Sequence, residues 1–128
     1  MSEQNLEVIR VFFGALERED FPAALQLFDP EVEWSTAEGD YRGLLGVTDS
    51  FAEWMEPWDE HKIDAEEFVE CGDDQVLATI HLTARGEHTG MEVDQHFFQV
   101  YTLRDGKIIR MVEYLDRARA LEAAKAKE

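Results

Sequence analysis

The sequence predicts an α+β domain in which helices come first and an antiparallel sheet follows. Before His61, apolar residues recur at intervals of three and four, which indicates amphipathic helices. From His61 onward the apolar period changes to two, which is typical of half-buried strands. Since only short turns separate these strands, we expect a meander packed on the helices. A length of 128 residues fits a single domain over residues 1–128.

The helices are predicted from apolar spacing and from their end signals. Ser2 and Asp20 are favourable N-caps, and Pro22 stands early in the second helix, where its missing N–H costs nothing. An alanine-rich segment closes the chain. The predicted helices cover residues 3–18, 20–28, 44 to about 57, and 117–126.

The strands are predicted over residues 32–35, 61–71, 75–86, 91–103 and 107–116. One strand register gives the central hairpin one apolar face and one face with an opposite-charge pair. Pairing Gly86 with Met91 places Arg85 opposite Glu92 and His81 opposite His96 on one face. The other face then becomes largely aliphatic and aromatic. A register shift by one residue would move the side chains of one strand to the opposite face and mix the two sets.

The last hairpin has two possible loops. A two-residue loop at Asp105-Gly106 would turn Arg110 and Tyr114 toward the apolar face. A three-residue loop, with Gly106 in the left-handed conformation, turns a different set of residues toward the apolar face. We prefer this loop because that set is more apolar. This set consists of Ile109, Met111, Glu113 and Leu115.

A second acid interrupts the strand at residues 61–71. Ile63, Ala65 and Val69 are expected to alternate inward, with Glu67 as the exception. Three strand steps of ~4.8 Å would hold Glu67 roughly 14 Å from Glu113. Paired carboxylates in glycoside hydrolysis lie at most ~9.5 Å apart. We therefore expect Glu67 in an ion pair or at a rim.

Composition excludes several classes of function. The chain has 29 acidic against 12 basic residues, a formal charge of -17, which disfavours nucleic-acid and membrane-surface binding. Cys71 is the only cysteine, so no intrachain disulfide can form. No apolar stretch approaches the roughly 20 residues of a spanning helix, and we expect a cytoplasmic protein. The absence of a glycine-rich phosphate loop, nucleophile elbow or redox motif predicts no cofactor.

Short segments along the whole chain resemble the SnoaL-like branch of the nuclear-transport-factor-2-like superfamily. They are Asp20–Leu25, Leu27–Trp34, Tyr41–Gly43, Gly72-Asp73, Tyr101–Lys107, Tyr114–Arg117 and Ala120–Ala124. The resemblance implies a cystatin-like fold, in which a curved antiparallel sheet forms a cone around the N-terminal helices and encloses a pocket. It also implies a homodimer through the outer face of the sheet.

The resemblance implies particular chemistries, which can be tested residue by residue. Ketosteroid isomerases use a carboxylate base, a tyrosine and a protonated aspartic acid. Ser35, Phe12 and Gln99 stand at those positions, so this chemistry is not expected. Limonene-epoxide-type hydrolases use an aspartate–arginine–aspartate set. Only Glu113 matches one member of that set, since Ile80 and Leu82 fall near the other two positions. In a SnoaL-type cyclase, Glu113 or Asp116 could supply the acid.

Glu113 is the candidate catalytic residue. An ionised carboxylate in an apolar stripe needs a partner, a raised pKa or a chemical role. It is expected to act as a general acid, a general base or a ligand anchor. The alternative is a structural hydrogen bond to Tyr41, Trp34 or Arg42.

Further residues are predicted to line the pocket and to bind the ligand. They are Trp34, Tyr41, Gln95, Gln99, Tyr101 and Met111. The alternative for Gln95, Gln99 and Tyr101 is that they hydrogen-bond to one another and to the backbone. The predicted function is therefore the binding of a small, largely apolar molecule, with a possible isomerase, cyclase or hydrolase activity. The competing hypothesis is a noncatalytic module whose pocket is filled, with Trp34, Phe12, Phe97 and Met111 in mutual contact.

His81 and His96 are expected on the outer face, beside Thr79, Phe98, Leu77 and Val100. Two ligands are too few for a zinc site, so no metal is predicted. An apolar face with a histidine pair is better explained as a dimer interface. His61 and His88 are expected at a strand start and a turn, in contact with solvent.

Overall fold

The computed structural model describes residues 2–36, 39–55, 60–86 and 90–125. Its helices are α1 (Ser2–Glu17), α2 (Phe21–Leu25), α3 (Gly43–Met55) and α4 (Arg117–Lys125). Its strands are β1 (Phe28–Thr36), β2 (Gly39–Arg42), β3 (Glu60–Cys71), β4 (Gln75–Arg85), β5 (Glu92–Arg104) and β6 (Lys107–Tyr114). No helix in these described ranges is long and apolar enough to cross a membrane.

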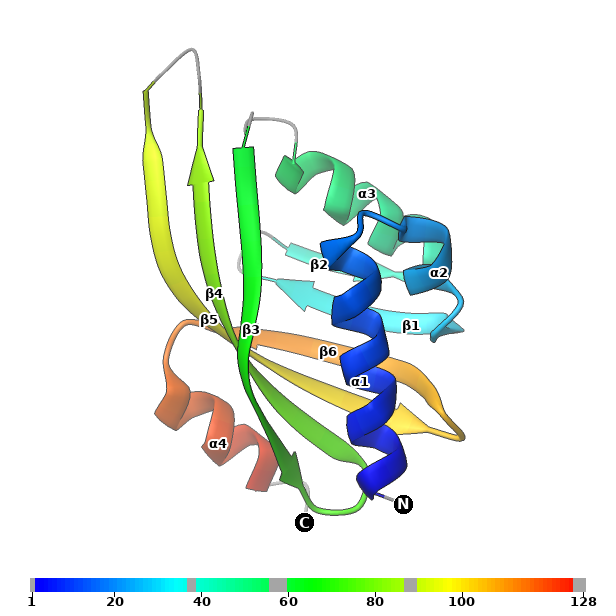
Figure 1. Ribbon diagram of the computed structural model, residues 1–128. Helices are drawn as coiled ribbons and strands as arrows, with labels where there is room; N and C mark the ends of the chain where they lie inside the picture. The colour runs from blue at the N-terminus through cyan, green and yellow to red at the C-terminus, as the bar shows by residue number, and fades with distance from the viewer. Residues whose placement is uncertain (1, 37–38, 56–59, 87–89, 126–128) are drawn as a thin grey trace.

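The predicted α+β class is confirmed, with one sheet in the order β2-β1-β6-β5-β4-β3. All neighbouring strands are antiparallel except β1 and β6, which run parallel. Figure 1 shows the long strands β3, β4 and β5 curving past α1, with α3 above α1 on the same side of these strands. This curvature gives the sheet the cone shape that the resemblance implied.

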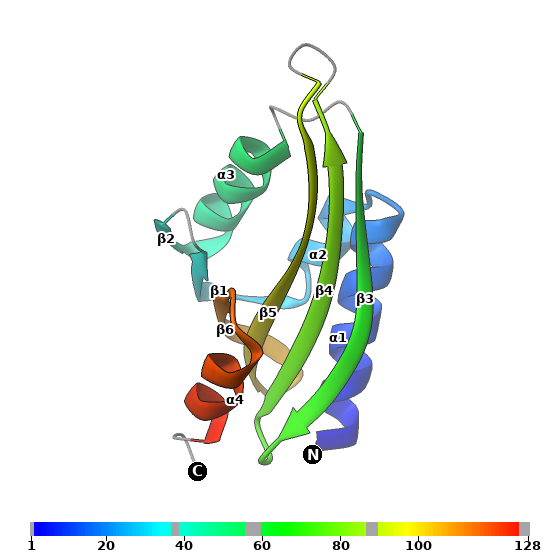
Figure 2. The same ribbon diagram turned by 90° about the vertical axis from the view of Figure 1, so that its left-hand side faces the viewer.

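Each face of the sheet has its own apolar cluster. The larger cluster fills the concave side, where Ile9 and Phe12 of α1 pack against Val76 of β4 and Tyr101 of β5. The smaller cluster lies on the outer face beneath α4, whose position outside the curved strands is visible in Figure 2. The sequence predicted this helix over residues 117–126 but did not predict where it packs.

Two local predictions need correction between α2 and β2. The second helix was predicted through Phe28, but it ends at Leu25, and Phe28 already begins β1. Phe28 is buried against the core, and its burial as a strand residue outweighs its helical spacing. The Asp20 cap is confirmed, since its carboxylate accepts a hydrogen bond from the Ala23 N–H (3.3 Å). The segment after β1, for which no strand was predicted, contains the short strand β2.

The predicted register of the central hairpin is confirmed along its whole length. Arg85 pairs with Glu92, His81 with His96, and Ile80 with Phe97. The Gly86 N–H donates to the Met91 carbonyl at 2.9 Å, as the predicted pairing requires. Alternating burial along β4 shows which side faces the core. This hairpin therefore fixes the inner and outer faces of the sheet.

For the final hairpin, the predicted loop length was wrong, and the predicted set of inward-facing residues was partly correct. Asp105 and Gly106 have φ angles of 54° and 76°, so they form a two-residue turn of the type that matches strand twist. A bulge then leaves Ile109 without a partner on β5. The extra residue restores Met111 and Glu113 to the inner face. Leu115, also expected inward, is exposed.

A second bulge, in β3, changes which residues of this strand face inward. Ala65 pairs with Ile80 and Glu67 pairs with Thr79, so Glu66 is the extra residue. Glu67 therefore faces outward, where its Oε1 lies 3.3 Å from Nη2 of Arg117. The predicted ion pair of Glu67 is confirmed, but its place in the inward stripe was wrong. Val69, predicted inward, faces the outer cluster instead.

Candidate ligand site

A cavity of about 150 Å³ lies between α1, α3 and the concave face of the sheet. Most of its wall is apolar. It is lined by Phe13, Leu16, Phe21, Trp34, Thr36, Ser50, Phe51, His61, Ile63, Ile80, Leu82, Phe97, Gln99, Tyr101 and Glu113. Pockets that bind small molecules have this composition, with a few polar groups set into apolar walls.

Phe12 of α1 is fully buried at the centre of an aromatic cluster. Its ring centroid lies 5.2 Å from that of Phe13, 5.3 Å from Phe28, 5.8 Å from Tyr101 and 6.3 Å from Trp34, all edge to face. Such arrangements are favourable for aromatic pairs. The interior is therefore partly filled by aromatic side chains, three of which, Phe13, Trp34 and Tyr101, also line the cavity.

The polar end of the cavity is a short hydrogen-bond chain across β5 and β6. The Tyr101 hydroxyl donates to Gln99 Oε1 at 2.6 Å, and the Gln99 amide nitrogen donates to Glu113 Oε2 at 2.9 Å. Gln99 and Glu113 are direct cross-strand partners. The β6 bulge is what brings Glu113 opposite Gln99 on this face.

The protonation state of Tyr101 sets the direction in which these hydrogen bonds run. Burial raises the pKa of Tyr101 well above its ordinary value, and the negative charge of Glu113 adds to the shift. The phenol therefore stays protonated and donates to the Gln99 oxygen. With its oxygen engaged, Gln99 turns its NH₂ group toward Glu113. The carboxylate is thereby held in the cavity wall by a partner that is itself oriented.

A carboxylate in this position can perform two tasks. It can accept a hydrogen bond from a hydroxyl or N–H group of a bound molecule. It can also take or return a proton, as carboxylates do in general acid–base catalysis. Among the residues that the structure describes, Glu113 is the only carboxylate lining the cavity.

The predicted site residues divide into two groups. Trp34, Gln99, Tyr101 and Glu113 lie in the cavity wall. The contact between Gln99 and Tyr101 is the one proposed as an alternative to ligand binding. Glu113 contacts Gln99, which the sequence analysis had not named as its partner.

The other three predicted residues lie outside the wall. Tyr41 donates its hydroxyl to Glu53 Oε2 at 2.9 Å. Gln95 falls on the inner side of β5 by register, but its side chain is exposed beyond the cavity. Met111 is fully buried next to Trp34 and packs beneath the site. Their predicted contact with a ligand has no support from these positions.

His61 was placed in solvent by the sequence analysis, and this was wrong. It is half-buried and lines the cavity. The signal that could have identified it is register: His61 pairs with Ala84, which lies on the buried side of β4. Extending the predicted hairpin register by one strand would have turned His61 inward. His88 lies outside the described residues.

The predicted outer face is less open than expected. Leu77 and Val100 are buried, because Ala120 and Ala124 of α4 pack on them. The remaining strip contains His81 and His96, whose rings are stacked with centroids 4.6 Å apart. Homodimerisation through this face stays a prediction.

Comparisons with known proteins agree with this geometry. The family model described as SnoaL-like domain matches residues 9–111. A search of curated protein sequences gave no match. Among solved structures, Bal32a from a soil-derived mobile gene cassette is 22% identical, with a TM-score of 0.82, covering 95% of this chain and 96% of its own.

Two further structures share the fold. TerC, co-crystallised with polyporic acid, is 24% identical with a TM-score of 0.78, and the match covers 95% of this chain and 98% of TerC. A putative SnoaL-like polyketide cyclase from Jannaschia Sp. CCS1 is 18% identical with a TM-score of 0.75, covering 98% and 94% of the two chains. At these identities the structural matches show the fold.

Proposed function

Because this chain belongs to the family of SnoaL-like domains, we propose that its inner cavity binds one small, largely apolar molecule and that Glu113 anchors the polar end of that molecule. The observation that carries this proposal is the Gln99–Glu113 pair in an otherwise mostly apolar cavity wall. A partly buried polar pair that faces a cavity fixes the orientation of a bound molecule, while the apolar wall supplies most of the binding free energy.

The size of the cavity supports a compact ligand. A volume of about 150 Å³ is comparable to apolar protein cavities that hold a single aromatic ring. TerC, with the same fold, was co-crystallised with polyporic acid, and another neighbour is described as a putative polyketide cyclase. Both descriptions support a small organic molecule as ligand. The hydroxyl or ketone group of such a molecule would face Glu113.

The reaction that this arrangement supports is proton transfer. Glu113 would remove a proton from an acidic O–H or C–H group of the bound molecule and return it at another atom, as in an isomerisation or cyclisation. The second candidate is binding without catalysis. Phe12 favours it, because a phenylalanine stands where the resemblance places a hydrogen-bond-donating tyrosine, and its ring cannot donate.

Native mass spectrometry of the freshly purified protein, compared with the denatured mass, tests the binding. We expect an extra mass of a small organic molecule, whose identity then provides the probe for affinity measurements. Glu113→Gln preserves shape but removes the charge, and should weaken binding about 10- to 100-fold, as expected for a charged hydrogen bond. The control is Glu53→Gln, whose carboxylate contacts Tyr41 outside the cavity.

Retention of the same molecule at the same occupancy by Glu113→Gln would contradict the anchoring role. Catalysis is tested separately by incubating the complex in deuterated water. Incorporation of deuterium into a C–H position of the ligand, lost in Glu113→Gln, would establish proton transfer. Tight binding without any incorporation would favour the noncatalytic function.

A further inference from the structure

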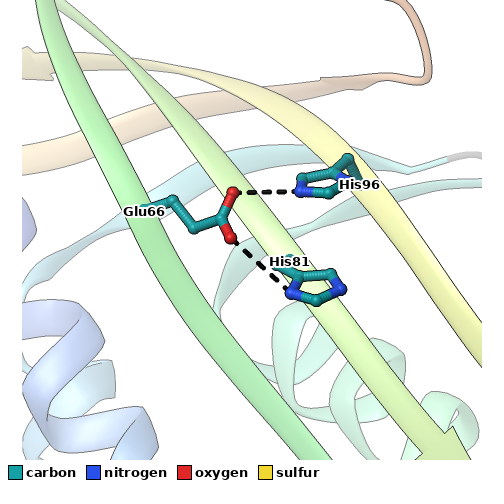
Figure 3. Close-up of side chains that lie close together, drawn as sticks. All are labelled: Glu66, His81 and His96. Atoms are coloured by element: carbon teal, nitrogen blue, oxygen red, sulfur yellow. Dashed lines mark hydrogen bonds and ion pairs between the residues drawn. The ribbon is translucent and has the colours of Figure 1, made fainter.

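Three side chains converge on the outer face of the sheet, away from the cavity. Figure 3 shows Glu66 of β3 pointing at the imidazoles of His81 on β4 and His96 on β5. Glu66 Oε1 lies 3.0 Å from His96 Nε2, and Glu66 Oε2 lies 3.6 Å from His81 Nδ1. One ligand atom from each residue can be chosen so that all three lie within 4.8 Å of one another.

The fold builds this cluster from two separate features. The hairpin register makes His81 and His96 direct partners, with their rings stacked at an angle of 9°. The β3 bulge makes Glu66 an extra residue on the outer side, next to this pair. A regular strand would not place two successive side chains, Glu66 and Glu67, on one face. The bulge thus supplies a third donor, which the alternating pattern of the sequence does not predict.

We propose that Glu66, His81 and His96 form a binding site for a divalent first-row transition metal ion, such as zinc. Two imidazole nitrogens and a carboxylate are the protein ligands of His₂Glu zinc sites and of two-histidine, one-carboxylate iron sites. Such ions bind these atoms at about 2.0–2.2 Å. All three side chains are partly exposed, at 44%, 26% and 47% respectively, so they have room to rotate toward a shared ion.

Asp94 completes the arrangement by orienting one ligand. His81 Nε2 lies 2.6 Å from Asp94 Oδ1, so Nε2–H donates to this carboxylate and Nδ1 is directed toward Glu66. Metal-binding histidines commonly use the second ring nitrogen in this way. The hydrogen bond to Asp94 is also the largest cause that raises the pKa of His81 above its ordinary value. The net charge of -17 favours the approach of a cation.

The site is tested with tag-free protein that has been stripped of metal and held at mildly alkaline pH. Cobalt(II) is added first, because its visible absorption bands report coordination by protein ligands. Zinc affinity is then measured by competition with a chelating dye. We expect one ion per chain, loss of the cobalt bands in His81→Gln and His96→Gln, and at least tenfold weaker zinc binding in Glu66→Gln. Asp94→Asn should weaken binding 10- to 100-fold.

His61→Gln is the matched control, since His61 lies on the same sheet but lines the inner cavity. It should leave metal binding unchanged. Equal affinity in the wild type and the His81→Gln/His96→Gln double variant would overturn the proposal, as would the absence of cobalt bands in the wild type. Long-range proton–nitrogen NMR of the wild type provides a readout without mutation. Zinc should shift Nδ1 of His81 and Nε2 of His96, and unshifted nitrogens would refute the site.

Discussion

The hydroxyl of Tyr101 organises the polar end of the cavity without needing to touch a ligand. It is fully buried and gives its hydrogen to Gln99, which in turn holds Glu113. Since burial keeps the phenol protonated, this donor persists across the ordinary pH range. The position of the Glu113 carboxylate therefore depends on a group two hydrogen bonds away.

Replacing Tyr101 by phenylalanine removes this donor and leaves the Gln99 oxygen without it. The free energy of unfolding should fall by about 1–2 kcal/mol, the usual cost of losing one buried hydrogen bond. Urea denaturation measures the change. Tyr41→Phe is the control, because its hydroxyl contacts Glu53 at an exposed position, and its effect should stay below about 0.5 kcal/mol. Similar losses in the two variants would contradict the structural role of Tyr101.

At the scale of elements, side-chain orientation could be predicted from the sequence where strands are regular, but not at the two bulges in β3 and β6. The β4–β5 register followed from opposite-charge and apolar pairs such as Arg85–Glu92, which tolerate no slip. Alternation alone placed Glu67 inward, because one extra residue at Glu66 is invisible to a period of two. At Ile109 an extra residue compensated for the wrong loop. Candidate residues beyond a bulge, such as Glu66, were therefore missed.

The docking of α4 rests on small side chains. Ala120 and Ala124 are fully buried against the outer face, so they allow the helix to approach Leu77 and Val100 closely. Ala120→Asp would place a charge in this contact and should cost about 2 kcal/mol or more. Ala118→Asp, exposed in the first turn of the same helix, should change stability by less than about 0.5 kcal/mol.

Urea denaturation of the two alanine variants decides whether α4 is a structural part of the domain. A large loss of stability in Ala120→Asp, without one in Ala118→Asp, agrees with a docked helix. Equal and small effects would mean that α4 leaves the sheet in solution, so that Leu77 and Val100 become exposed.

At the scale of the molecule, the order of the elements and the apolar period were sufficient to predict the fold class. Helices before His61 and strands after it gave the α+β class, and short turns gave the meander. The parallel pairing of β1 with β6 joins segments distant in sequence, and no local signal specifies it. The cavity was likewise expected from the resemblance, but the way Phe12 packs among four other rings and fills part of the interior was not.

A homodimer through the outer face would use the strip beside α4, which includes Thr79 and His96. Two chains that each carry a charge of -17 repel one another, so their association should strengthen as salt is added. Sedimentation equilibrium at low and moderate ionic strength measures this dependence. Thr79→Glu adds a negative charge to each copy at the contact and should weaken the dimer at least tenfold. Thr48→Glu, exposed on α3, is the control.

The pattern of results identifies the face that is used. Selective weakening by Thr79→Glu, reversed in part by salt, places the outer strip in the interface, because only charges at short range add strongly to the repulsion. Equal weakening by both variants would attribute the effect to net charge alone. A monomer at all concentrations and salt conditions would contradict the dimer, and Glu66, His81 and His96 would then face solvent in the working protein.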